Sequence, residues 1–383
     1  MNPIQRKYVA ILFCLLVRPV FCPALLAEEP FRYPEATYGK GQLKYIDNLP
    51  VLTVSGSPEE MGEQIGRLAL KPARQVPEAL WQYFKNIGSG NAILIAMPIA
   101  RGIYDRFPQE YRRELDAMAK AANVDHDQIV LANTFLEIGN LLGCSSLLVS
   151  AERSKTGKPL LGRNLDFGGI AAISRSGLII VYHPTGKQSY AIATFPGLLA
   201  TGTGMNEHGL VLATHSISGA ADGSRFNPKG LSIAVSLRRG FEECSSVDDV
   251  EKWLRAHPLM SKGALAVSDP KTQAILEVTP KTVARRGPVD GICCATNHFR
   301  TPELATSMTC RRFDALEKSR DIGKLSVDDV ARLMHAANSG AATIQTVVFE
   351  PATLTLHASL GIGPTSARPL HTLDLTRLLQ QGK

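Results

Sequence analysis

The feature that most constrains the fold is a change in hydrophobic period at Cys144. Residues 57–143 carry apolar side chains at helical spacing: Tyr111, Leu115 and Met118 fall at i, i+4 and i+7 on one helix face. From Cys144 onward, short runs typical of strands alternate with Gly, Pro, Asp and Asn turn signals. We therefore expect a helical segment that leads abruptly into a strand-rich body.

The order of these elements predicts the fold class α+β. A helix is expected to begin at residues 57–60, where Ser takes the N-cap, Pro the first position and Glu the third. Two later helices share the opening Ser-Val-Asp-Asp, at 246–249 and 326–329, which we interpret as an N-cap signature and not as a repeat. Sheets covered by helices fit this order, although propensity alone does not separate a four-layer αββα stack from other α+β arrangements. The strands are expected at 145–151, 178–183, 189–195, 210–215, 264–267, 274–278, 292–297, 343–349 and 353–359.

Residues 1–27 have the pattern of a secretory signal peptide. A short basic region is followed by the apolar run 10–17 and by small residues that end at Ala27. The run is too short to span a bilayer comfortably, so an uncleaved anchor is the less favoured alternative, as is a lipoprotein modified at Cys22. We expect an exported protein, periplasmic or secreted, without stable membrane insertion once residues 1–27 are removed.

Charge and cysteine content limit the function classes. Removing Arg6, Lys7 and Arg18 with the signal peptide lowers the formal net charge from +7 to +4, and no Lys/Arg cluster suggests a nucleic-acid partner. The cysteine spacings match no metal site, and the glycines at 202, 204 and 209 do not form a dinucleotide-binding loop, so no cofactor is predicted. The mature chain keeps an odd number of cysteines, which leaves at least one free thiol. These cysteines are Cys144, Cys244, Cys293, Cys294 and Cys310.

Several short motifs are each weak alone. Cys144 follows Gly143 where a helix ends and a strand begins; a buried structural cysteine is the simpler interpretation, but a glycine carbonyl before a thiol is open to attack. The segment 162–167 (GRNLDF) reads equally well as a turn with a salt bridge. Residues 204–210 (GMNEHGL) give a hairpin signal. Residues 296–299 (TNHF) end a strand.

Together, and in this order, the motifs resemble the penicillin acyltransferase family of cysteine N-terminal-nucleophile hydrolases. Bile salt hydrolases, penicillin V acylases and the acid ceramidase group are more distant relatives. The resemblance covers about residues 50–360 and includes GSPEEMGEQIG (56–66) and Gly143-Cys144-Ser145. It implies a four-layer αββα fold made as a precursor. Cleavage before Cys144 would give a mainly helical piece, 28–143, and a strand-rich piece, 144–383, which together form one domain and an α/β heterodimer.

The resemblance also assigns roles to six residues. Cys144 would be the nucleophile, with its own freed α-amine as the base, because a thiol with a pKa near 8.5 needs help at neutral pH. Asp166 would orient the amine, and Arg163 would lower the pKa of the thiol. The side-chain amide of Asn297 and the backbone N–H of Asn206 would bind the oxyanion. Arg312 would form a central ion pair, with a register uncertain by one because Arg311 precedes it. Most relatives carry Cys-Thr where this chain has Cys144-Ser145, a change that keeps the hydroxyl.

The expected activity is cleavage of a non-peptide acyl amide through a thioester, with transfer of the acyl group to water or to an amine. A fatty-acyl or aromatic-acyl amide is preferred as substrate, while a lactone or β-lactam would also fit. The apolar run 92–99 is favoured as a core helix over an acyl pocket or lid. Two alternatives stay open. One is an exported binding protein with Cys144 buried, and the other is an uncut cysteine hydrolase with His215 or His298 as base.

Overall fold

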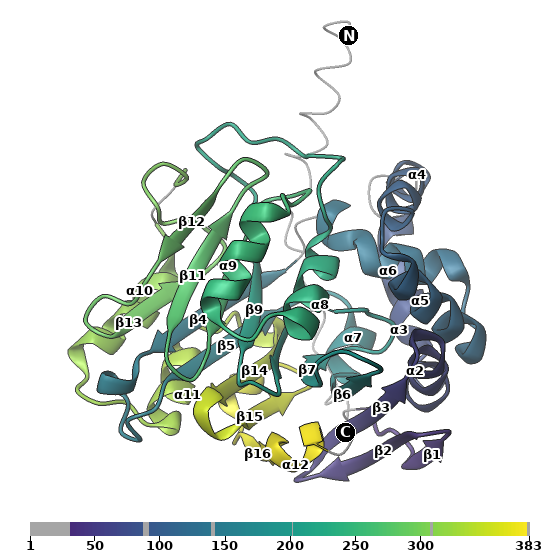
Figure 1. The fold of residues 1–383 in the computed structure, drawn as a ribbon, viewed down its shortest axis with the longest axis horizontal. Helices are drawn as coiled ribbons and strands as arrows, with labels where there is room; N and C mark the ends of the chain where they lie inside the picture. Colours follow the sequence, from purple (N-terminus) through teal and green to yellow (C-terminus); the bar gives the residue numbers. More distant parts are fainter. Residues whose placement is uncertain (1–30, 87–91, 139–141, 201, 307–308, 381–383) are drawn as a thin grey trace, which may run out of the picture.

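The computed structural model describes residues 31–86, 92–138, 142–200, 202–306 and 309–380; the expected signal peptide lies outside them. Two sheets dominate the fold (Figure 1). The ten-stranded sheet has the order β1-β2-β3-β6-β7-β8-β9-β10-β11-β12, and the six-stranded sheet has the order β13-β4-β5-β14-β15-β16. Neighbouring strands are antiparallel except for the parallel pair β3 and β6.

Nine of the strands lie close to the ranges that the sequence predicts after Cys144, and four others in that part of the chain were not predicted. The strands of the two sheets are β1 (Ala36–Tyr38), β2 (Gly41–Ile46), β3 (Leu49–Gly56), β4 (Gly143–Val149), β5 (Leu160–Asp166), β6 (Leu178–Pro184), β7 (Tyr190–Thr194), β8 (Thr203–Asn206), β9 (Val211–Ser216), β10 (Gly263–Ser268), β11 (Gln273–Val278), β12 (Val283–Arg286), β13 (Ile292–Ala295), β14 (Thr343–Glu350), β15 (Thr355–Leu360) and β16 (His371–Asp374). The segment before Cys144 is thus not only helical, because β1, β2 and β3 form one edge of the large sheet.

Most helices cover the outer face of one of the two sheets, whereas the leucines of the C-terminal helix pack in the layer between the sheets. The helices are α2 (Pro58–Ile65), α3 (Gln75–Asn86), α4 (Ala92–Tyr104), α5 (Gln109–Ala122), α6 (His126–Ile138), α7 (Ala171–Arg175), α8 (Ile233–Glu243), α9 (Val247–Ala256), α10 (Arg311–Glu317), α11 (Val327–Ala336) and α12 (Leu375–Gln380), with the π-helical turn η1 (Gly66–Leu70) after α2. Helices α2 to α6 gather beside the large sheet in Figure 1, and α8 and α9 also lie on it. Helices α10 and α11 lie against the small sheet.

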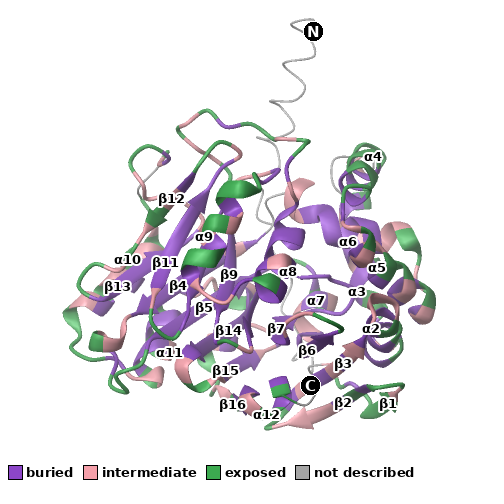
Figure 2. Cartoon of the chain, viewed as in Figure 1, coloured by how far each residue is buried: buried purple, intermediate pink, exposed green. Residues whose placement is uncertain are grey.

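The strands of both sheets are largely buried (Figure 2). Strand alternation builds three hydrophobic layers. On β6, Ile180 packs toward the helices while Ile179 and Val181 face the second sheet. On β4, Leu148 faces the first sheet while Leu147 packs against α11. Because one face of each strand is buried between the sheets and the other under helices, the architecture is a four-layer αββα sandwich, as the resemblance implied.

The sequence signals for helix starts are confirmed. Ser57 and Glu60 form a reciprocal capping box at α2, and Ser246 and Ser326 cap α9 and α11. The core-helix interpretation of residues 92–99 holds for one face only: Leu94 is 71% exposed on α4 although Met97 is buried. In the described ranges, no helix is both long and apolar enough to cross a bilayer.

Candidate active site

The site forms where β4 begins beside β5. Gly143 is paired with Asp166, Cys144 with Leu165 and Ser146 with Arg163 in the antiparallel register. Because side chains alternate along a strand, Cys144 and Arg163 face the space between the sheets, whereas Asp166 points to the helical side. The interpretation of GRNLDF as a turn with an Arg–Asp salt bridge is therefore wrong, since β5 continues through Asp166 and the two side chains lie on opposite faces.

Arg163 is the nearest charged group to the thiol. Its Nη2 lies 3.2 Å from Cys144 Sγ and donates to the carbonyl oxygen of Thr214 at 2.7 Å. Arg163 is 1% exposed, and no carboxylate forms an ion pair with it among the described residues. Burial raises the pKa of the Cys144 thiol; Arg163, Arg312 and the backbone N–H of Ser216 oppose this rise, and Asp166 adds to it. The thiol of the continuous chain is thus held protonated at neutral pH.

Asp166 is held by three side chains. Its carboxylate accepts hydrogen bonds from Ser339 Oγ at 2.7 Å and Thr343 Oγ1 at 2.6 Å, and Arg312 Nη1 lies 3.1 Å from Oδ2. A β-carbon at Gly143 would lie 3.0 Å from the same Oδ2 atom. Asp166 is therefore fixed directly beside the backbone that precedes Cys144.

Arg312 and Asn297 connect these groups. Arg312 Nη1 donates to the carbonyl oxygen of Cys144 at 2.6 Å and to Ser145 Oγ at 3.1 Å, and its Nη2 donates to Asn297 Oδ1 at 2.7 Å. The backbone N–H of Cys144 donates to the same Asn297 oxygen at 2.8 Å. Arg311 instead donates to the backbone of Asn338, so Arg312 is the central arginine.

The side-chain nitrogen of Asn297 is a donor that lies near the bond between Gly143 and Cys144. Its Nδ2 donates to the carbonyl oxygens of Leu142 at 3.1 Å and Ser216 at 2.8 Å. The structure thus brings together Cys144, Arg163, Asp166, Asn297 and Arg312 in one connected set of contacts.

Asn206 does not belong to this set of contacts, and its predicted role as an oxyanion donor stays a prediction. Its backbone N–H donates to the carbonyl of Leu210 at 3.0 Å. Its side-chain oxygen accepts from the N–H groups of His208 and Leu210, and its amide nitrogen donates to the carbonyl of Cys244 at 2.8 Å. A side chain used in this way closes the β8–β9 turn and fixes α8, because turn asparagines bond to nearby backbone groups.

Sequence reasoning missed three parts of the site. The N–H of Ser216 lies at the thiol, and Ser339 and Thr343 hold Asp166. No motif marks these residues, because they come from the ends of β9, the α11–β14 connection and β14, which meet only in the folded chain. Cys293 and Cys294 face opposite sides of β13, and the five described cysteines are all free thiols.

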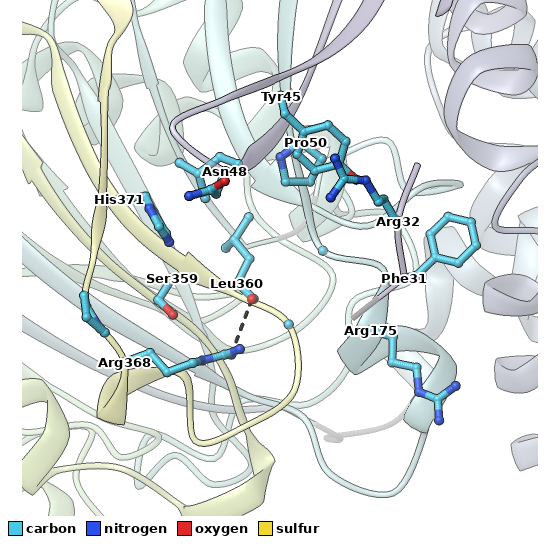
Figure 3. A pocket seen from close by; sticks show the side chains of 14 residues that line it. Phe31, Arg32, Tyr45, Asn48, Pro50, Arg175, Ser359, Leu360, Arg368 and His371 are labelled. Carbon is cyan, nitrogen blue, oxygen red and sulfur yellow. Dashed lines mark hydrogen bonds between the residues drawn. The ribbon is translucent and has the colours of Figure 1, made fainter. Parts of the chain in front are cut away.

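A cavity of about 500 Å³ lies elsewhere and takes no part in this set. Its walls include Arg32, Tyr45, Arg175, Leu360 and Arg368, and none of the candidate residues lines it (Figure 3). Figure 3 shows Arg368 bonded to the backbone oxygen of Leu360, at 3.4 Å. The cavity is basic but is not assigned to the thiol.

Comparisons with known proteins match one family over part of the chain. The family described as acyl-coenzyme A:6-aminopenicillanic acid acyl-transferase matches residues 153–322, a segment that begins after Cys144. No curated protein matched the sequence. A mutant conjugated bile acid hydrolase from Clostridium perfringens is 14% identical over 61% of this chain and 93% of its own, with a TM-score of 0.43. Penicillin V acylase from Agrobacterium tumefaciens is 13% identical over 63% and 89%, with a TM-score of 0.45. An N-acylethanolamine-hydrolyzing acid amidase orthologue from Caenorhabditis elegans is 14% identical over 55% and 93%, with a TM-score of 0.41.

The matched segment contains GRNLDF, GMNEHGL, TNHF and Arg312. Three of the motifs on which the sequence-based resemblance depends thus lie in the matched segment, whereas GSPEEMGEQIG (56–66) and Gly143-Cys144-Ser145 lie outside it. The resemblance is confirmed: this αββα chain is related, through residues 153–322, to the acyl-coenzyme A:6-aminopenicillanic acid acyltransferase family.

Proposed function

We propose that the chain is an exported, self-processing cysteine N-terminal-nucleophile enzyme that cleaves or transfers the acyl group of a non-peptide amide. One observation carries the proposal. The Cys144 thiol contacts a buried guanidinium that has no carboxylate partner among the described residues, while the N–H of the same residue contacts Asn297 beside Asp166. Nucleophile, charge and amine-binding groups thus converge on one residue. A buried structural cysteine needs none of them.

The high pKa of the buried thiol favours a mechanism with a dedicated base. Cleavage before Cys144 would free an α-amine, whose ordinary pKa near 8 lets it accept the thiol proton. In the continuous chain that nitrogen already lies 2.8 Å from Asn297 Oδ1. The Asp166 carboxylate, next to Gly143, would orient the amine once Gly143 has left.

Asn297 is the proposed oxyanion donor. In the continuous chain its Nδ2 is occupied by the carbonyl of Leu142. Departure of the segment that ends at Gly143 would free this donor for the oxyanion of a substrate, and the N–H of Ser216 would serve as the second donor in place of Asn206. Each such donor is typically worth about 3–4 kcal/mol in a dry site.

The proposed reaction follows from these positions. The thiolate adds to the amide carbonyl, the C–N bond breaks, and the leaving amine takes the proton from the α-ammonium group. Water or a second amine then attacks the thioester, gives its proton to the α-amine, and restores the thiol. The guanidinium of Arg163 favours the thiolate throughout, because an opposite charge lies within contact distance.

Intact mass and N-terminal sequencing of wild type and Cys144→Ala test the proposal. Scaling the mass of 41.4 kDa by residue count predicts pieces of roughly 13 and 26 kDa, the larger beginning Cys-Ser-Ser. Cys244→Ala is the matched control, because Cys244 is a free, buried thiol at the end of α8 and not one of the residues that contact Cys144. A single uncut chain in wild type would contradict self-processing and favour a binding protein or an uncut thiol enzyme.

Activity is tested with a series of N-acyl p-nitroanilides that carry alkyl or aryl acyl groups, with and without an added amine. Release of p-nitroaniline by wild type and its loss in Cys144→Ala would support an amide-cleaving enzyme. Formation of the new amide in the presence of the amine would distinguish acyl transfer from hydrolysis. A cut protein that releases no p-nitroaniline from any member would contradict the proposed substrate class.

A further inference from the structure

Behind the thiol, the two sheets enclose a group of polar side chains. Ser146, Arg163 and Gln345 project from the six-stranded sheet, and Thr203 and His215 project from the ten-stranded sheet toward them. None is more than 1% exposed. We call these five residues the inter-sheet polar cluster. It lies within an otherwise apolar layer made of residues such as Leu161 and Ala213.

Several polar atoms of the cluster have no hydrogen-bond partner within the protein. They are Nε and Nη1 of Arg163, both ring nitrogens of His215, both amide atoms of Gln345, and the hydroxyl oxygens of Ser146 and Thr203. An unpaired buried polar group costs about 1–3 kcal/mol, and one on a charged side chain costs more. So many atoms in one place therefore point to shared ordered water, which usually bonds to about three such groups.

The atoms lie close enough to share water. A β-carbon placed at Gly202 would be 3.4 Å from Gln345 Oε1 and 3.8 Å from Arg163 Nη1, so these two atoms flank the same small space. Ser146 is paired with Arg163 in the register of β4 and β5. Arg163 Nη2 donates to the carbonyl oxygen of Thr214, the residue next to His215 on β9. The cluster is thus one connected site that includes the free edge of the Arg163 guanidinium.

His215 is suited to be an acceptor in this site. Burial, Arg163 and Arg312 hold its pKa well below the ordinary value, and the carbonyls of Ala264 and Ala213 oppose this only in part. A neutral imidazole carries a proton on one ring nitrogen only, so the other ring nitrogen of His215 can accept a hydrogen bond. The charged groups that act on it are Arg163 and Arg312.

We propose that His215 is a positioning residue: through water shared with Gln345, it accepts hydrogen bonds from the free edge of Arg163 and thereby holds the opposite edge against the Cys144 thiol. This inference rests on the proposed function, because it assigns a purpose to the Arg163–Cys144 contact. It differs from the Cys/His alternative, in which His215 would itself take the thiol proton.

The pH dependence of Cys144 alkylation by iodoacetamide tests the inference without any substrate. The readout is the mass of the peptide that begins at Cys144, and Cys310 in the same sample is the internal control. His215→Phe keeps a ring but removes the acceptor, whereas His215→Asn keeps an acceptor. Gln345→Met tests the same water from the facing sheet and does not depend on the folding of the His215 variants. Thermal unfolding identifies any variant that is not folded.

In His215→Phe, the alkylation rate at pH 7 is expected to fall about tenfold, because a misplaced Arg163 raises the pKa of the thiol by about one unit. His215→Asn should stay within about threefold of wild type. Gln345→Met should show the same direction as His215→Phe, and the double variant should fall no further than the stronger single variant, since both act on one unit.

Three results would overturn the inference. Folded, cut His215→Phe and Gln345→Met with the wild-type alkylation profile would show that Arg163 needs no support from the cluster. A complete loss of reactivity in His215→Asn as well as His215→Phe would assign His215 as the base. Fully additive effects of the two substitutions on the alkylation rate would show that His215 and Gln345 do not act through shared water. Failure of the proposed function is distinct, because wild type itself would then stay uncut.

Discussion

Asp166 lies so close to Gly143 that a β-carbon at residue 143 would be 2.9 Å from the Asp166 β-carbon. This distance is shorter than real side chains adopt, and Asp166 is not free to move because Ser339, Thr343 and Arg312 hold it. Glycine is therefore required at this position for steric reasons as well as for an accessible carbonyl. The same contact would bring the carboxylate to the new N-terminus once Gly143 has left.

Gly143→Ala should consequently slow self-processing by about tenfold or more, because the methyl group displaces the start of β4 from Asp166. A time course of the uncut and cut species by gel electrophoresis measures the rate. Gly102→Ala on α4 is the matched control, because a β-carbon there meets nothing within 4 Å. Cutting of Gly143→Ala at the wild-type rate would refute the steric requirement.

Two adjacent arginines give the sharpest test of the site. Arg312→Gln removes the donor shared by the Cys144 carbonyl and Asn297 and leaves the 4% exposed carboxylate of Asp166 without its cation. Processing and iodoacetamide reactivity of Cys144 are expected to fall about 100-fold or more. Arg311→Gln removes only a bond to the backbone of Asn338 and should stay within about twofold of wild type. Equal losses of processing and of Cys144 reactivity in the two variants would contradict the assignment of Arg312 as the arginine that supports the site.

The parts of the fold that the sequence predicted depend on interactions between residues that are close together in the chain. The strand runs after Cys144 and the caps at Ser57 and Ser326 depend on neighbouring residues, and they appear where expected. Residues 49–56 were not predicted as a strand, although their pattern of buried positions on β3 follows the period of two. Their pairing with β6, more than 100 residues later, is a tertiary contact that no local pattern reveals.

The contacts at the site that the sequence did not predict have the same origin. Asn206 was assigned from a motif, and its bonds within the β8–β9 turn and to Cys244 could be seen only in the folded chain. The contact of Ser216 with the thiol depends on how β9 of one sheet meets β4 of the other. Chemistry-bearing residues could thus be selected from the sequence, whereas backbone donors and supporting hydroxyls could not.

A buried ion cluster far from the thiol should dominate the stability of the helical layer. Arg238 bonds to Glu114 on α5 and to Glu242 on α8, and all three side chains are 1% exposed. Arg238→Met would leave two buried carboxylates with their main cation removed, at a cost of about 3–5 kcal/mol in the free energy of unfolding. Urea denaturation measures this cost. Arg239→Met is the control, because its partially exposed ion pairs should be worth only about 0–1 kcal/mol. Similar losses in the free energy of unfolding in both variants would contradict the prediction that Arg238 contributes more to stability than Arg239.

Glu137, at the end of α6, should make folding stability depend on pH near neutrality. Its Oε1 accepts the N–H of Ile233 at the start of α8, and burial raises its pKa from an ordinary 4.5 to about 7. Between those two values the native state binds more protons than the unfolded state, so the free energy of unfolding falls as the pH rises. The loss is complete above pH 7 and amounts to at most about 3 kcal/mol.

Glu137→Gln isolates this contribution, because glutamine keeps the acceptor oxygen for Ile233 but does not ionise. The difference in free energy of unfolding between wild type and variant, measured by urea denaturation at several pH values, should shift in favour of the variant from pH 4.5 to pH 7 and then stay constant. Histidines that titrate in the same range, such as His183 with its lowered pKa, contribute equally to both proteins and cancel. Parallel stability curves would show that Glu137 ionises in the folded protein as easily as it does in water.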